Sequence, residues 1–169
     1  MSIRYVGAIL VILACGGCGF SMAAAFRREE QLLRQLSDIL QFLYCELQFR
    51  LTPLPELCAE VSGKGRGTMY AFFGCLGELL RQNRYPLVKD CVYAAMEQKE
   101  LSPEIRGLLV ALGQTLGQFD LSGQLSGLEA VRHRCGQALE SLCRGREDRI
   151  RSYQTLGLCA GSALAILFV

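Results

Sequence analysis

The chain has 169 residues, of which 51% are hydrophobic and 20% are charged, and its formal net charge is +2. This length holds one domain of ordinary size and little else, so a second folded domain is excluded. A nucleic-acid-binding surface is also excluded, because the arginines are spread along helical stretches instead of gathering on one basic face with aromatic residues.

The N-terminal segment predicts a membrane helix. From Tyr5 to Phe26 the sequence has no charged residue, which is long enough to span a hydrocarbon core of roughly 30 Å at about 1.5 Å per residue. Arg27 and Arg28 follow directly, and basic residues mark the cytoplasmic flank of a membrane helix. The alternative is a lipoprotein signal ending at Cys15, which would place the domain outside the cytoplasm. The apolar stretch continues well past this cysteine, which favours the membrane helix.

The middle of the chain predicts a series of amphipathic helices. An apolar stripe at intervals of three and four residues continues from the first membrane helix to about Arg50, with no helix breaker between them. Further helices are predicted through Leu57 and Val61, from Met69 to Leu80, from Leu87 to Met96 and from Ile105 to Leu116. The glycine-rich segment Gly63 to Gly67 is predicted as a solvated linker, since it lacks the spacing of a phosphate-binding loop.

Prolines and small polar residues mark the predicted starts and ends of these helices. Pro53 ends the first stripe, because proline lacks a backbone donor and disfavours helical geometry in the residue before it. Ser102 and Pro103 predict a helix start, with serine as the cap and proline in the first turn. The pattern breaks again near Asp120, after which a long final helix is expected to open at Ser122 or Gly123.

The C-terminal segment predicts a second membrane helix. After Arg151 no charge appears, and residues 152–169 would form about 27 Å of helix. Its alternative is a hydrophobic tail packed on the domain. We therefore predict an N-terminal transmembrane helix over residues 1–26, a cytoplasmic helical domain over 27–151, and a C-terminal transmembrane helix over 152–169. In a reducing cytosol the cysteines of the domain should form no disulfide.

The sequence contains no catalytic or metal-binding constellation. Its single histidine, His133, stands between two arginines on a polar helical stretch, which is typical of a solvated surface residue. Cys15 and Cys18 have the spacing of a redox motif but lie in the apolar N-terminal segment. We expect no enzyme activity, no cofactor and no metal. The alternative of a ligand-binding helical protein requires a convergent polar pocket, for which the sequence shows no cluster.

Four stretches in a fixed order resemble a known family. They are the N-terminal apolar segment, RREEQLLRQLSDILQFLYCELQFRLTPL, LGQTLGQFDLSGQ, and the C-terminal SYQTLGLCAGSALAILFV. Together they resemble the stage III sporulation protein AB family of endospore-forming bacteria over nearly the whole chain. The high cysteine content and the glycine-rich loop depart from the family pattern.

This resemblance implies an all-α fold. The cytoplasmic helical bundle would be similar to the cytoplasmic domain of platform proteins in type II secretion and type IV pilus machines. The implied role is non-enzymatic, in the mother-cell membrane around the forespore, within the secretion-like channel complex needed for endospore formation. The implied partners are other stage III sporulation membrane components and an operon-encoded cytoplasmic ATPase, with no nucleic acid; homo-oligomerisation stays open.

Two groups of residues are candidates for a partner interface or for structural turns. The groups are Glu46, Thr52, Pro53 and Leu54, and then Gln114, Gly117, Asp120 and Gln124. Each group lies at a break in the helical pattern, so the alternative role for all of them is to form turns and helix caps. If the protein is a platform, its working surface should be an exposed apolar or charged patch on the bundle.

Overall fold

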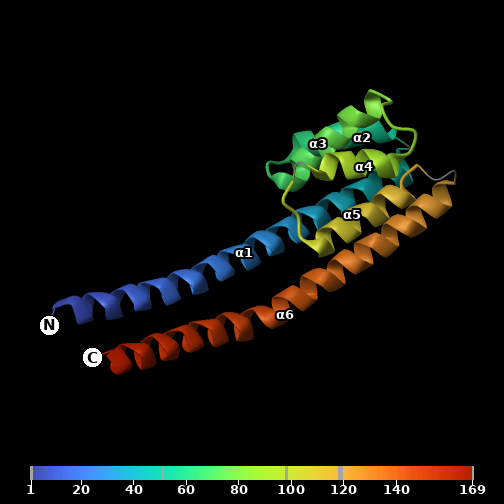
Figure 1. The fold of residues 1–169 in the computed structure, drawn as a ribbon. Helices are drawn as coiled ribbons and strands as arrows, with labels where there is room; N and C mark the ends of the chain where they lie inside the picture. The colour runs from blue at the N-terminus through green and yellow to red at the C-terminus, as the bar shows by residue number, and fades with distance from the viewer. Residues whose placement is uncertain (1, 51, 98, 118–119, 169) are drawn as a thin grey trace. The chain divides into compact units, whose positions relative to one another are not determined.

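In the computed structural model, every regular secondary-structure element of the described residues is an α-helix (Figure 1). It describes the backbone of residues 2–50, 52–97, 99–117 and 120–168, and the side chains of residues 24–50, 52–97, 99–117, 120–144, 155 and 159. The helices in chain order are α1 (Ser2–Phe49), α2 (Leu54–Lys64), α3 (Thr68–Arg81), α4 (Val88–Glu97), α5 (Pro103–Thr115) and α6 (Leu121–Phe168). The predicted all-α fold class is confirmed.

The chain divides into two compact units. Unit 1 contains residues 1–30 and 140–169, which are the outer parts of the two long helices. Unit 2 contains residues 31–139, and it includes all four short helices together with the inner parts of α1 and α6. The core and the candidate site described below belong to unit 2.

Helix α1 is continuous from the N-terminal segment into unit 2, as its unbroken pattern predicted. Its stripe is buried at Leu32, Leu33, Leu36, Ile39, Leu40, Leu43 and Leu47. The helix ends at Phe49, before Pro53, whose φ of −56° and ψ of 139° begin α2. The carbonyl oxygen of Pro53 accepts a hydrogen bond from the backbone N–H of Leu57 at 3.0 Å. Proline therefore ends one helix and starts the next, as the sequence indicated.

Helices α2 and α3 form an antiparallel pair. A Cβ placed on Gly77 would lie 3.2 Å from the carbonyl oxygen of Pro55 and 3.0 Å from the Cβ of Cys58, so the two backbones approach closely at this glycine. Phe72 and Phe73 of α3 are fully buried, and their rings make an edge-to-face contact with centroids 5.3 Å apart. This pair supplies the largest apolar side chains of the core.

Helices α4 and α5 form the next pair, and the predicted cap of α5 is confirmed. The Oγ of Ser102 accepts a hydrogen bond from the backbone N–H of Ile105 at 3.4 Å, and Pro103 is the first helical residue. The prediction that Leu87 belongs to the buried stripe of α4 is wrong. This residue precedes the helix, where its carbonyl oxygen accepts from the backbone N–H of Asp90 at 3.1 Å, and its side chain is 52% exposed.

Helix α6 returns antiparallel to α1 within unit 2 (Figure 1). It starts at Leu121, one residue before the first predicted start. The Sγ of the buried Cys135 donates to the backbone carbonyl oxygen of Leu33 at 3.6 Å. One turn away, the guanidinium of Arg132 donates to the side-chain oxygen of Gln41. The inner parts of the two long helices thus close the core of unit 2.

In the part of the chain that the structure describes, no helix has a stretch both long enough and apolar enough to cross a membrane. The predicted membrane helices, residues 1–26 and 152–169, lie almost wholly outside the residues whose side chains are described. The same is true of the two N-terminal cysteines considered for a lipoprotein signal and a redox motif.

Candidate functional site

Both groups of candidate residues lie at one end of unit 2. We call this the far end and define it by Phe49, the last residue of α1, and Leu121, the first residue of α6. The opposite end is the one through which the chain continues toward its termini. Helices α2 and α4 begin at the far end and α3 and α5 finish there, as Figure 1 shows. The fold therefore brings together chain breaks that are far apart in the sequence.

Close contacts of glycines with neighbouring helices join these helix ends to one another. A Cβ placed on Gly127 would lie 2.5 Å from the Cγ2 of Thr115, which brings the start of α6 against the end of α5. A Cβ on Gly117 would lie 2.7 Å from the Cγ2 of Val88, which brings the end of α5 against the start of α4. The contact of α3 with Pro55 extends this arrangement to the start of α2.

Glu46 is partly buried near the end of α1. Its side chain is 14% exposed, and its Oε2 lies 3.7 Å from the Nη1 of Arg50, whose own side chain is 70% exposed. Among the described residues this oxygen accepts no hydrogen bond. Buried carboxylate oxygens usually have a hydrogen-bond donor. The Arg50 guanidinium, one helical turn further along the chain, is therefore the charged neighbour of this buried oxygen.

Thr52, Pro53 and Leu54 form the turn between α1 and α2. Pro53 is exposed and stands at the cap position of α2, while Leu54 is the first residue of that helix and is half-buried. Thr52 is also half-buried. This placement gives the three residues a structural role in the turn.

Asp120 caps α6. Its Oδ1 accepts a hydrogen bond from the backbone N–H of Ser122 at 3.0 Å, and its Oδ2 accepts one from the hydroxyl of the same serine. Its carbonyl oxygen accepts from the backbone N–H of Gln124 at 3.0 Å. Two hydrogen bonds from Ser122 lower the pKa of the exposed Asp120 carboxyl. The bond from the serine side chain has the larger effect, and the bond from its backbone N–H has the smaller one. The negative charge is therefore kept at the positive end of a helix dipole.

The remaining candidates flank this cap. Gly117 has a φ of +81°, a conformation that favours glycine, and it follows the end of α5. Gln114 is exposed in the last turn of α5, whereas Gln124 is half-buried in the first turn of α6. The positive φ of the turn between α5 and α6 therefore favours glycine at position 117. Gln114 and Gln124 lie on the helices on either side of this turn.

Sequence reasoning missed four exposed apolar residues at the far end. Phe49 is 78% exposed, Leu87 is 52% exposed, and Leu121 and Tyr85 are 39% and 38% exposed. All of them lie where a helix ends or begins at the far end. For Tyr85 and Leu87, the neighbouring Pro86 was a signal in the sequence that could have indicated a turn. The side chain of a residue in a turn need not lie on the buried stripe of the next helix.

Reactive chemistry has little support in the described part of the chain. Burial raises the pKa of the Cys58 thiol to about 12 and that of the Cys135 thiol to about 11, so both are protonated at neutral pH. The described residues hold no group of three or more His, Cys, Asp or Glu side chains able to bind a metal. His133 is exposed on α6.

Comparison with known proteins gives one consistent result. The sequence profile of the family described as stage III sporulation protein AB matches residues 4–169. The stage III sporulation protein AB of Bacillus subtilis (strain 168) is 23% identical over 177 aligned residues, which cover 99% of each chain. A solved structure of stage III sporulation protein AB superposes with a TM-score of 0.64 at 17% identity, covering 72% of this chain and 98% of the other.

The profile match includes both long helices and every short helix between them. At 17% identity, the structural likeness shows the fold, and the fold it shows is helical as here. The resemblance inferred from the four sequence stretches is confirmed. The chain belongs to the stage III sporulation protein AB family.

Proposed function

We propose that this chain is a non-enzymatic integral membrane component of the secretion-like complex between mother cell and forespore. Its helical domain would act in the mother-cell cytoplasm as a platform on which other components assemble. The observation that carries the proposal is the continuity of the two long helices. Helices α1 and α6 each have 48 residues and connect the packed core of unit 2 directly with the apolar ends of the sequence.

The charges beside these ends support the orientation. Arg27 and Arg28 are exposed on α1, and Arg144, Arg146, Arg149 and Arg151 precede the C-terminal apolar segment. Positive residues on both inner flanks favour a cytoplasmic middle domain. The similarity to type II secretion platform proteins, the other stage III sporulation membrane components and the cytoplasmic ATPase as partners belong to this proposal through the family.

Thiol labelling tests the membrane topology. In intact sporulating cells, a membrane-impermeant maleimide should leave the half-buried Cys45 and Cys143 unmodified, and it should label them after permeabilisation and mild unfolding. The chain should also remain in the membrane fraction after a carbonate wash. Labelling of either cysteine in intact cells would place the domain outside the cytoplasm. A lipid on Cys15, seen by mass spectrometry, would favour an exported lipoprotein instead.

Co-purification tests the platform role. The full-length protein, extracted in mild detergent from sporulating cells, should bring down the other membrane components and the ATPase of the complex. Recovery of the protein alone, from cells that contain those components, would contradict the assembly role.

A further inference from the structure

The outer face of α4 carries three side chains in one line, which we call the α4 stripe. Lys89, Tyr93 and Glu97 are the exposed residues of this helix, and the others are buried or half-buried. Residues four apart lie on the same face of a helix. None of the three forms a hydrogen bond or an ion pair with another residue that the structure describes. The opposite face of α4 packs against α3 and α5, so the stripe is the free side of this helix.

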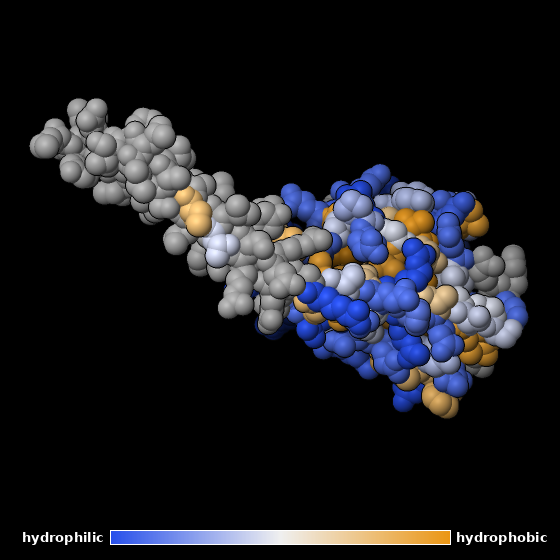
Figure 2. All heavy atoms as spheres, turned by 90° about the horizontal axis from the view of Figure 1, so that it is seen from below, coloured by the Kyte–Doolittle hydropathy of each residue, from blue (hydrophilic) through white to orange (hydrophobic). Residues whose placement is uncertain are grey.

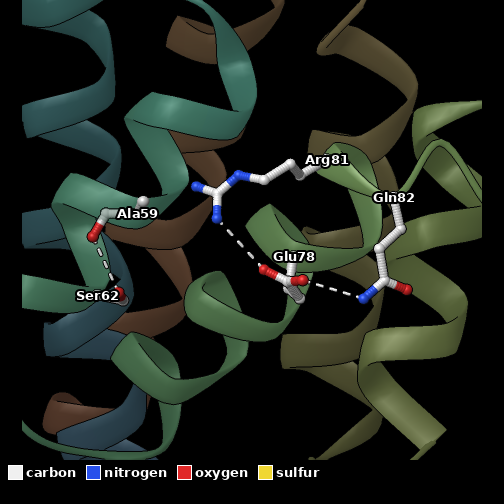
Figure 3. Close-up of polar contacts among 5 residues, drawn as sticks. All are labelled: Ala59, Ser62, Glu78, Arg81 and Gln82. Carbon is white, nitrogen blue, oxygen red and sulfur yellow. Dashed lines mark hydrogen bonds and ion pairs between the residues drawn. The ribbon is translucent and has the colours of Figure 1, made fainter.

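The charges of the stripe have no partner within their own helix. On α3 the carboxylate of Glu78 lies 3.4 Å from the Nη1 of Arg81 and accepts a hydrogen bond from the Nε2 of Gln82 at 3.0 Å (Figure 3). Lys89 and Glu97 cannot pair in this way, because eight residues of helix separate them by about 12 Å along the axis. Lys89 also lies in the first turn of α4 and Glu97 in its last, whereas the helix dipole favours the opposite placement. The two charges therefore do not stabilise α4 by itself.

Tyr93 is an aromatic residue that is exposed in the middle of a helix. Its side chain is 51% exposed. The other large hydrophobic residues exposed in the described part of the chain lie at a helix end or in a turn, and they are Phe49, Tyr85, Leu87 and Leu121. Figure 2 shows, on the face it presents, that hydrophobic residues reach the surface among hydrophilic ones. Tyrosine is enriched at protein interfaces, because its ring buries apolar area while its hydroxyl group forms a hydrogen bond. Tyr93 is therefore suited to the centre of a contact.

We propose that α4 docks against α4 of a second copy of this chain, antiparallel to it, about a two-fold axis at Tyr93. Lys89 and Glu97 lie equally far before and after this tyrosine in the sequence. The axis therefore places Lys89 of each copy opposite Glu97 of the other. The stripe is then its own complement, as an interface with two-fold symmetry requires. A parallel arrangement would bring like charges together, which is unfavourable.

The neighbouring charges agree with a second copy as the occupant. Asp90 is half-buried and lies about 100° around the helix from Lys89, in the first turn, where the dipole favours an acidic residue. Lys99 and Glu100 follow the helix with opposite charges. This mixture of signs selects neither an acidic nor a basic partner, whereas a second copy carries the matching mixture. Because α4 is about 15 Å long, its face is smaller than the roughly 800 Å² per partner of a stable interface, and we expect weak, reversible association.

Photocross-linking of the full-length chain in cells tests this pairing. Tyr93 is replaced by p-benzoylphenylalanine, and two copies of the chain carry different epitope tags, so that an adduct between copies is recognised. Ultraviolet light should give an adduct that contains both tags. Mass spectrometry should find the linked residue between Lys89 and Glu97 of the other copy. The same probe at Phe49, an exposed residue outside α4, should give little of this adduct.

Charge reversals in the chain that carries the probe at position 93 test the ion pairs. Lys89→Glu alone creates two like-charge pairs by symmetry and should lower the adduct yield about tenfold, and Glu97→Lys should do the same. The double variant restores both pairs, so its yield should return to within about twofold of the parent. The matched controls are Arg134→Glu and Glu60→Lys, which make the same changes at exposed positions on α6 and α2. They should keep the yield within about twofold, because charges outside a contact contribute little.

Thermal melting of the purified full-length variants separates docking from folding. Each single reversal places its new charge where the helix dipole of α4 favours it, so these variants should melt at or above the parent temperature while they lose the adduct. Several results would overturn the proposal. They are no adduct between copies at Tyr93, a linked peptide outside α4, an adduct only with another protein or with lipid, no restoration in the double variant, and a loss of adduct that follows a lower melting temperature. The proposal is independent of membrane anchoring, since every residue of the contact lies in unit 2.

Discussion

The thiol of Cys135 on α6 donates a hydrogen bond to the backbone carbonyl oxygen of Leu33 on α1 at 3.6 Å, and both side chains are buried. A contact to the backbone requires the two helices to approach closely at this point. Cysteine is small and only weakly polar, so it fills the space without burying an unpaired charge. The residue therefore has a packing role that its isolated position in the sequence did not indicate.

The middle domain should fold without the terminal apolar segments. A fragment of residues 27–149 contains the whole of unit 2, and its buried stripes have their partners within it. We expect a soluble, mainly helical protein with a cooperative thermal transition. Circular dichroism checks this prediction. A folded, monomeric fragment with a strand-rich spectrum would contradict the helical assignment.

Cys135→Leu should destabilise this fragment by about 1–3 kcal/mol, because the larger side chain would press against the α1 backbone. The control is Cys143→Leu on the same helix, at a half-buried position, where the change should stay within about 0.5 kcal/mol. Denaturant unfolding measures both free energies. Equal effects at the two positions would show that the approach of α1 and α6 at Leu33 is not tight.

Gly117→Ala should destabilise the fragment by about 1–3 kcal/mol, because a non-glycine residue is strained at positive φ. The added Cβ would also lie 2.7 Å from the Cγ2 of Val88. Gly107→Ala is the opposite control, since Gly107 is an exposed residue inside α5 with nothing within 4 Å of an added Cβ. That change should stabilise by about 0.5–1 kcal/mol. Thermal melting of the two variants should shift in opposite directions.

Local chemistry in the sequence predicted the helices well. Ser102 with Pro103 located the start of α5, and Pro53 located the junction of α1 and α2, because each of these residues restricts its own backbone. Leu87 was misassigned for a physical reason. It lies next to an apolar stripe, and periodicity cannot distinguish the residue before a helix from the first residue within it.

The far end could not be predicted in the same way. Glu46 and Asp120 were selected because each lies at a break in pattern, yet their placement at one end of a bundle depends on how six helices pack. Exposure of Phe49 follows from its position as the last residue of α1, after the buried Leu47. Such features depend on tertiary contacts that a single sequence does not specify.

Alkaline pH should weaken the fold through Cys58. Burial raises its pKa to about 12 from an ordinary value of 9.0, so between these values the unfolded chain loses a proton that the folded chain keeps. Stability is then fully present below pH 9 and decreases as pH rises toward 12, by up to about 1.4 kcal/mol per pH unit. Cys58→Ala should reduce this slope, most clearly between pH 11 and 12, because the buried Cys135, whose pKa is raised to about 11, contributes a slope of its own at lower pH. Cys75→Ala keeps Cys58 and should retain the slope, so identical slopes in both variants would contradict the burial argument.

The role of Asp120 can be separated into a cap and a partner contact. If it acts only as the cap of α6, Asp120→Asn should melt near the parent temperature, because an amide oxygen can still accept from the backbone N–H of Ser122. Asp120→Ala should melt lower, since that N–H loses its acceptor. Both variants should then co-purify with partners in proportion to their stability. Melting of the fragment and co-purification of the full-length chain provide the two measurements.

The pH dependence of Asp120 gives an independent check. Its hydrogen bonds with Ser122 lower the carboxyl pKa below the ordinary 3.8, so the charged cap stabilises the fold above that value and this contribution is lost as pH falls through the lower, folded-state pKa. The parent should therefore lose more stability than Asp120→Asn when acidified from pH 5 to pH 2. Equal losses would show that the charge adds nothing to the cap. An Asn variant with normal melting but reduced co-purification would assign the carboxylate to a partner, because a charge-assisted hydrogen bond weakens when the charge is removed.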